Sequence, residues 1–193
     1  LNTVLQNLYS TNFFEDVKVS IIGSTLRINL KEYPIVNQLT ILGEKSNKFK
    51  EQIEDIISTK EKKSFIKSLL SKDIELIKNM YSSAGYNFTK VEAKIKELDN
   101  EKLDLIIDID RGSKTKISSI TFIGNNYIRS NRLRDIIASE ENKFWKVLSR
   151  NVNFTENLLE LDKRLITNYY KSLGFYDVKV QSNIAEINKV GEI

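Results

Sequence analysis

Carboxylates are the main side chains in this chain that could do chemistry, because its 193 residues include no histidine and no cysteine. That excludes Ser/His/Asp and Cys/His nucleophilic sites and removes the commonest ligands of transition metals. Asp104, Asp108 and Asp110 share one face of a predicted strand, opposite its apolar residues. An acidic stripe for a cation is one interpretation, but a solvated strand face is the favoured one. We therefore expect no enzyme, no metal and no cofactor.

Aromatic residues are the next candidates, because a net charge of +4 and a pI near 9.0 permit a nucleic-acid partner. Bases would be expected to stack on aromatics of an exposed sheet face. Tyr86 and Phe175 instead begin predicted strands, close to Tyr81 and Tyr170 at helix ends. This placement favours packing of helix against strand. A nucleic-acid-binding α+β repeat protein remains the alternative, although we expect no nucleic-acid partner.

Phe144 and Trp145, the only tryptophan, lie in a segment that a repeat comparison marks as an insertion. Tryptophan is enriched at interface hot spots, so this pair is a candidate docking loop for a partner. The same residues are equally compatible with a small satellite core formed with Val147, Leu148 and Phe154.

Three segments of the chain align without a gap: 9–19, 81–91 and 170–180. Each reads as the end of an apolar-striped helix, a tight reversal and an alternating strand, which indicates a modular array. Residues 34–112 contain the clearest complete module, with the order β-α-α-β-β. We predict an α+β fold of tandem modules, each with a three-stranded sheet packed on two antiparallel helices.

The other two copies are incomplete in this sequence. Residues 113–193 repeat the order with an eight-residue insertion within 142–154 and lack most of the last strand. Residues 1–33 are predicted to be the C-terminal part of an earlier module. The chain starts inside a predicted helix and therefore looks like a piece of something longer. No segment has the ~20 consecutive apolar residues that a membrane-spanning helix needs.

The module order resembles that of POTRA (polypeptide-transport-associated) repeats, as do the strand-Gly-Asn opening at 120–125 and the Tyr-x3-Gly-aromatic helix ends at 81–86 and 170–175. The chain is similar in particular to the BamA-like family of outer-membrane protein assembly factors, with Phe13 where the other copies have glycine. The resemblance implies a periplasmic arm that precedes a C-terminal membrane barrel absent from this sequence. It also implies unfolded outer-membrane proteins and accessory lipoproteins as partners. The arm of a related secretion or translocation transporter is a further alternative.

The resemblance also implies that the second strand of each module lies at a sheet edge, where a client can add a strand. In the complete module the outward side chains of this strand would be Lys90, Glu92, Lys94 and Lys96. Edge lysines discourage pairing, and the third copy carries fewer charges at these positions. We therefore predict the third copy's strand as the better acceptor, formed by Phe175, Tyr176, Asp177, Val178, Lys179, Val180, Gln181 and Ile184.

Overall fold

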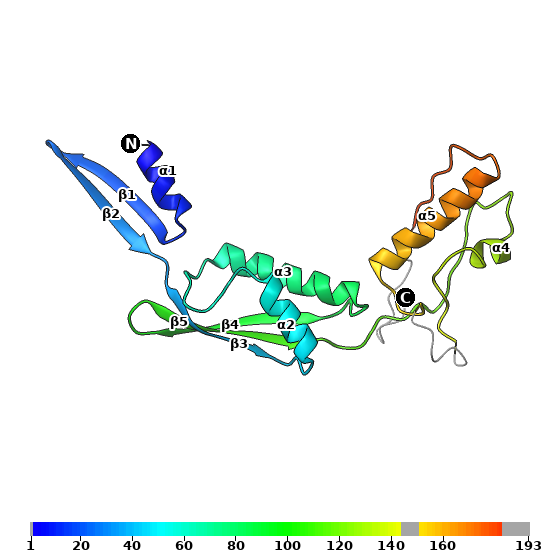
Figure 1. Cartoon of the computed structure of the whole chain (residues 1–193), viewed down its shortest axis with the longest axis horizontal. Coiled ribbons are helices and arrows are strands. Elements are labelled where there is room, and N and C mark those ends of the chain that lie inside the picture. The colour runs from blue at the N-terminus through cyan, green and yellow to red at the C-terminus, as the bar shows by residue number, and fades with distance from the viewer. Residues whose placement is uncertain (1, 144–150, 183–193) are drawn as a thin grey trace. The chain divides into compact units, whose positions relative to one another are not determined.

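The computed structural model describes residues 2–143 and 151–182, which contain both helices and strands (Figure 1). The α+β class predicted from the sequence is confirmed. The chain divides into two compact units, Leu1–Ile77 with Val91–Asp110, and Lys78–Lys90 with Arg111–Ile193. The two units are described separately below.

The first unit begins with helix α1 (Asn2–Ser10) and the hairpin of β1 (Phe14–Ile22) and β2 (Thr25–Glu32). The two strands are antiparallel, and their register places apolar residues opposite one another, including Val19 opposite Ile28. The hydroxyl of Tyr9 accepts a hydrogen bond from the backbone N–H of Val17 at 3.2 Å and so connects α1 to β1. This order of one helix and two strands is the one predicted for the C-terminal part of a module.

The sheet of the complete module is formed by β3 (Ile35–Leu42), β4 (Lys90–Leu98) and β5 (Lys102–Asp110). Helices α2 (Asn47–Ile56) and α3 (Lys67–Ser83) separate β3 from β4 in the chain and lie on one face of the sheet (Figure 1). The strand order is β3-β5-β4, with β3 parallel to β5. The central strand supplies four almost fully buried residues to the core: Leu103, Leu105, Ile107 and Ile109.

Local signals explain where these elements end. Gly43 follows β3 with φ +79°, and a Cβ atom built there would lie 1.9 Å from the carbonyl oxygen of Ile109, so only glycine fits. Gly85 follows α3 with φ +92°, the left-handed backbone with which many helices end. Ser46 stands at the N-cap of α2, but its side chain makes no capping hydrogen bond.

The second unit contains the short helix α4 (Ser130–Arg134) and α5 (Glu156–Ser172) around a core of Ile128, Leu133 and Ile166. Thr155 caps α5, because its Oγ1 accepts a hydrogen bond from the N–H of Leu158 at 3.1 Å.

The strand predicted at 120–123 is not formed, and residues 175–182 pair with no strand in the described part of the chain. In the complete module the corresponding strands are both paired with a central strand. Both β3 and β4 pair with the central β5 and not with each other. Tyr170 follows Tyr81 by 89 residues, and the same spacing places the equivalent of Lys102, where β5 begins, at residue 191. That position lies outside the described residues.

Candidate strand-pairing site

β4 is an outer strand, with β5 as its one strand neighbour among the described residues. The outer side of such a strand presents backbone N–H and C=O groups that have no ladder partner. Val91 is buried, whereas Lys90, Glu92, Lys94 and Lys96 are exposed as the alternation predicted, although Ile95 on the inward side is also 44% exposed. β4 therefore combines an open backbone edge with a charged solvent face.

One of these lysines is held by the neighbouring strand. Nζ of Lys94 lies 2.9 Å from a carboxylate oxygen of Asp108 on β5. The hydrogen bond to the Asp108 carboxylate, and its charge, raise the pKa of Lys94 above its ordinary value. An exposed pair of this kind contributes little to stability. Its effect here is that Lys94 is directed across the sheet face towards β5.

The opposite outer strand, β3, is covered along its N-terminal half by residues 61–65, a segment we call the clasp. The N–H of Val36 donates a hydrogen bond to the carbonyl oxygen of Lys63 at 3.0 Å. The N–H of Lys62 donates one to the carbonyl oxygen of Val36 at 2.7 Å. The N–H of Phe65 donates to the carbonyl oxygen of Pro34 at 2.7 Å. Backbone groups already paired in this way are not available to an extended client. β4 is therefore the more accessible edge of this sheet.

An equivalent clasp is present in the third copy. The N–H of Ile117 donates to the carbonyl oxygen of Val152 at 2.8 Å, and that of Phe154 to the carbonyl oxygen of Thr115 at 2.8 Å. The N–H of Asn142 donates to the carbonyl oxygen of Ile117 at 2.7 Å, as Lys62 does to Val36. These matching bonds locate the insertion between Asn142 and Val152. The predicted docking residues Phe144 and Trp145 lie outside the described residues.

Residues 175–181, which carry most of the predicted acceptor edge, lie after α5. The Phe175 ring centroid is 5.7 Å from that of Tyr170 and 5.0 Å from that of Tyr127. Val180 packs on the core of the second unit. Burial alternates as predicted, with Val178 and Val180 partly buried and Tyr176, Asp177, Lys179 and Gln181 exposed. Ile184 lies outside the described residues, and acceptor activity at this segment stays a prediction.

The recurring aromatic residues pack locally, as the sequence favoured. Tyr81 is fully buried, and its ring meets that of Tyr86 edge to face, with centroids 6.2 Å apart. The Tyr170 and Phe175 rings are also close to perpendicular, at 72°. The guanidinium carbon of Arg111 lies 4.8 Å from the Tyr86 ring centroid. These contacts account for the aromatic pairs as packing residues at the helix ends.

The sequence patterns did not reveal a buried aspartate that recurs at equivalent positions of the two modules. Asp73 in α3 is fully buried and accepts hydrogen bonds from the N–H groups of Ser58 and Thr59 at 2.7 and 2.8 Å. Asp162 in α5 accepts hydrogen bonds from the N–H groups of Ala138 and Ser139 at 2.6 and 3.2 Å, both at Oδ1, whereas the two donors of Asp73 bond to separate oxygens. The signal was available, because both aspartates precede their helix-end tyrosine by eight residues.

The acidic side chains of β5 have protein partners. The Asp104 carboxylate accepts a hydrogen bond from Nδ2 of Asn37 at 2.7 Å, and Asp108 pairs with Lys94. Within residues 2–143 and 151–182, no group of three or more metal-ligating side chains is clustered. No helix in the same residues combines the length and apolar character that crossing a membrane requires.

Comparison with known proteins identifies relatives over almost the whole chain. The outer membrane protein assembly factor BamA of Neisseria meningitidis serogroup B is 25% identical over 191 residues, covering 97% of this chain and 24% of that protein. BamA of Buchnera aphidicola is 26% identical, covering 92% of this chain and 29% of that protein. The chain thus spans about a quarter of the length of these relatives.

Solved structures show the same fold. The crystal structure of Haemophilus influenzae BamA POTRA3-5 superposes with a TM-score of 0.52 at 18% identity, covering 99% of this chain and 76% of that one. The POTRA family model, described as a surface antigen variable number repeat, matches residues 34–112 and 115–193. Because these two matches include most of the sequence, the chain belongs to the POTRA family.

Proposed function

We propose that this chain is a non-enzymatic periplasmic arm of an outer-membrane β-barrel assembly machine. Its task would be to bind unfolded outer-membrane proteins through strand addition and to dock accessory lipoproteins. Membership of the POTRA family supports this proposal, as do the relatives named outer membrane protein assembly factors. The arm would belong to an outer-membrane protein, and its contact with the membrane would be through a barrel outside this sequence.

The observation that carries the proposal is the asymmetry of the β3-β5-β4 sheet. The clasp bonds to β3, whereas β4 pairs with β5 on its inner side only, within the described residues. An extended client can pair with an open edge irrespective of its side chains, because backbone N–H and C=O groups make the contact. Residues 175–181 of the third copy are proposed as a second acceptor, and Phe144 with Trp145 as a docking loop for a lipoprotein.

Backbone pairing at such an edge predicts weak capture. Each added hydrogen bond contributes roughly 0.5–1.5 kcal/mol, so four or five bonds give only a few kcal/mol before ordering costs. A dissociation constant on the order of millimolar to tens of micromolar follows. Weak binding suits an arm that must pass clients onward, and two acceptor edges would add avidity.

The test is an NMR titration of the 15N-labelled chain with a soluble peptide of about ten residues that alternates valine with threonine and lysine, a length typical of a barrel strand. We expect chemical-shift changes of β4 amides, from Lys90 to Leu98, that saturate in the micromolar to millimolar range. Shift changes at 175–181 would mark the second acceptor.

The matched control is the same peptide N-methylated at alternate residues, which removes backbone donors and leaves the side chains unchanged. Strand addition predicts that this peptide gives no saturable shift at β4. Equal binding of both peptides would contradict the proposal. A salt-sensitive response to an RNA or DNA oligonucleotide, with no response to the peptide, would favour the nucleic-acid alternative instead.

A further inference from the structure

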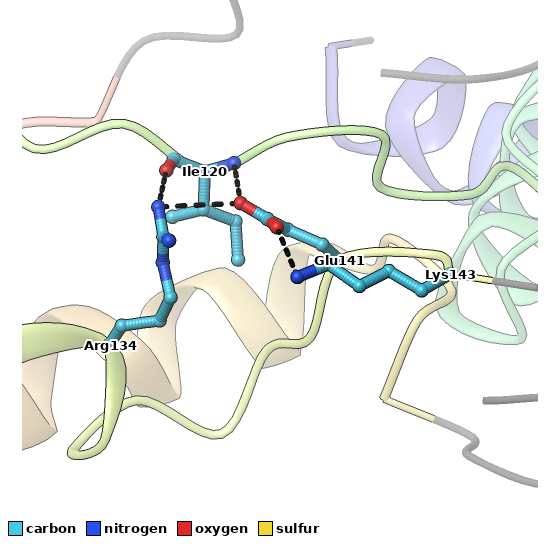
Figure 2. Close-up of polar contacts among 4 residues, drawn as sticks. All are labelled: Ile120, Arg134, Glu141 and Lys143. Atoms are coloured by element: carbon cyan, nitrogen blue, oxygen red, sulfur yellow. Dashed lines mark hydrogen bonds and ion pairs between the residues drawn. The ribbon is translucent and has the colours of Figure 1, made fainter. Parts of the chain in front are cut away.

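A glutamate carboxylate accepts a hydrogen bond from a backbone N–H of β3 in the complete module and of the equivalent segment in the third copy. Oε1 of Glu61 accepts a hydrogen bond from the N–H of Leu39 at 2.9 Å. Oε1 of Glu141 accepts one from the N–H of Ile120 at 3.1 Å (Figure 2). The two glutamates are 80 residues apart and their two targets 81 apart, so the contact recurs at equivalent positions of the repeat.

The direction of the Leu39 N–H shows what the contact covers. Backbone N–H groups of a strand lie in the plane of the sheet and point to one neighbouring side or the other. β5 occupies the inner side of β3, whereas the Leu39 N–H is bonded to Glu61 from the clasp. The carboxylate therefore occupies an outer-edge donor that an added strand would need.

In the third copy the cover extends to the carbonyl group of the same residue. Nη2 of Arg134 donates to the carbonyl oxygen of Ile120 at 2.7 Å and lies 3.4 Å from Oε1 of Glu141. Nζ of Lys143 lies 3.3 Å from the other carboxylate oxygen of Glu141 (Figure 2). Both backbone groups of Ile120 are thus occupied by one ion-paired cluster.

The electrostatics of the cluster keep this cover in place at neutral pH. The hydrogen bond from the Ile120 N–H lowers the pKa of Glu141, and Lys143 and Arg134 lower it further, against the effect of partial burial. Glu141 therefore remains an anion, which accepts hydrogen bonds more strongly than a neutral carboxyl group.

In each copy the glutamate side chain is bonded to a residue beyond those that the clasp backbone contacts. In the complete module the clasp backbone covers Val36, and Glu61 covers Leu39 farther along β3. In the third copy the backbone of Asn142 and Val152 covers Ile117, and Glu141 covers Ile120. A side chain thus extends the cover beyond the backbone contacts, on the β3 edge in the complete module and on the equivalent segment in the third copy.

We propose that Glu61 is a specificity-determining residue that closes the β3 edge of the complete module and so confines strand addition to β4, and that Glu141 covers the equivalent segment of the third copy. Closure of the edge is independent of what the arm binds. The confinement of clients to β4 rests on the proposed function.

The experiment compares the 193-residue chain with Glu61→Ala, which removes the acceptor, and Glu61→Gln, which retains a neutral one. Glu51→Ala is the matched control, because Glu51 is exposed on α2 of the same module. Amide hydrogen exchange at Leu39 reports closure, and titration with the alternating peptide reports which edge is used. Glu61 is exposed, so its removal leaves the core intact.

We expect Leu39 to exchange roughly fivefold to tenfold faster in Glu61→Ala, because a hydrogen bond of ordinary strength is lost. Glu61→Gln should restore most of the protection, and Glu51→Ala should match the unaltered chain. Peptide shifts should extend from β4 to β3 in Glu61→Ala only.

Unchanged exchange at Leu39 in Glu61→Ala would overturn the closing role. Faster exchange with peptide shifts still confined to β4 would overturn the confining role. If the unaltered chain binds no peptide, the proposed function fails separately. Closure is then decided by Leu39 exchange together with sedimentation analysis, in which an opened edge should give concentration-dependent self-association of Glu61→Ala and not of Glu61→Gln.

Discussion

At the scale of single residues, a buried aspartate anchors each of the two modules through backbone hydrogen bonds. Asp73 connects α3 to the turn after α2, and Asp162 connects α5 to the turn after α4. A buried carboxylate that loses its hydrogen-bond donors is costly, and so are N–H groups that lose their acceptor. Asp73 therefore fixes the position of α3 relative to the turn after α2, and Asp162 fixes α5 relative to the turn after α4.

Asp73→Asn should destabilise the module by about 2 kcal/mol, because the amide offers one acceptor oxygen where two backbone donors need partners. Urea denaturation followed by circular dichroism would measure the loss. Asp55→Asn is the matched control, since Asp55 is exposed on α2, and it should change stability by less than about 0.5 kcal/mol. Equal effects of the two substitutions would refute the anchoring role.

Glu141 predicts a pH dependence of the third copy. Its pKa is lowered in the folded chain, so its contribution to stability is fully present above the unfolded value near 4.5 and is lost as pH falls through the lower folded value. The difference in thermal midpoint between the unaltered chain and Glu141→Gln should therefore be constant from pH 7 to about pH 5 and shrink below that. A difference that stays constant down to pH 3 would contradict this assignment.

At the scale of elements, the connection between β3 and α2 depends on a close approach to the central strand. Gly43 lies against the carbonyl group of Ile109, and its left-handed backbone sets the exit of the chain from the sheet. Gly23 in the β1–β2 turn has a similar φ of +61° but no heavy atom within 4 Å of its would-be Cβ. Substituting each glycine by alanine therefore distinguishes the free-energy cost of a positive φ, present at both sites, from the cost of steric crowding, present only at Gly43.

Gly43→Ala should destabilise the complete module by about 3 kcal/mol or more, since the backbone must shift as well as adopt a strained φ. Gly23→Ala should cost only the conformational part, about 1 kcal/mol. Thermal unfolding of both variants measures the difference between them. Similar losses would show that crowding against Ile109 contributes nothing.

At the scale of the whole molecule, the described residues show paired strands in the β1–β2 hairpin and in the sheet of the complete module. In that sheet both outer strands, β3 and β4, pair with the central β5. Residues 175–181 of the third copy have the alternating burial of a strand and pair with no other strand in the described part of the chain. The position that corresponds to the start of β5 lies outside the described residues, so strand pairing of this segment stays a prediction.

Much of the fold was readable in the residues. The alternation of Leu103, Leu105, Ile107 and Ile109 predicted the buried face of β5, and Gly85 predicted the end of α3. These signals are local, because side-chain period and backbone conformation are set by neighbouring residues. The partition of the chain at residues 33/34 and 112/113 stays a prediction, and the family matches at 34–112 and 115–193 support it.

The candidate site was predictable only in part. The family resemblance placed the second strand at an edge, but nothing in the residue pattern showed that the other edge is covered. Glu61 and Glu141 looked like ordinary charges of polar segments, and Asp73 looked like one polar residue of an amphipathic helix. Their roles depend on backbone groups 22 and 21 residues away and on a turn 14 residues away. Recurrence at the repeat spacing marks these positions, but it does not show which backbone groups the carboxylates contact.

The sequence by itself determined the repeated module, its element order, its buried faces and its lack of histidine and cysteine chemistry. Those properties follow from residue types and from spacing along the chain. Only the tertiary structure decided which outer strand is open, because hydrogen-bond partners of edge groups come from segments that are distant in sequence. β3 is bonded to the clasp and to Glu61, whereas β4 has β5 as its one strand neighbour among the described residues.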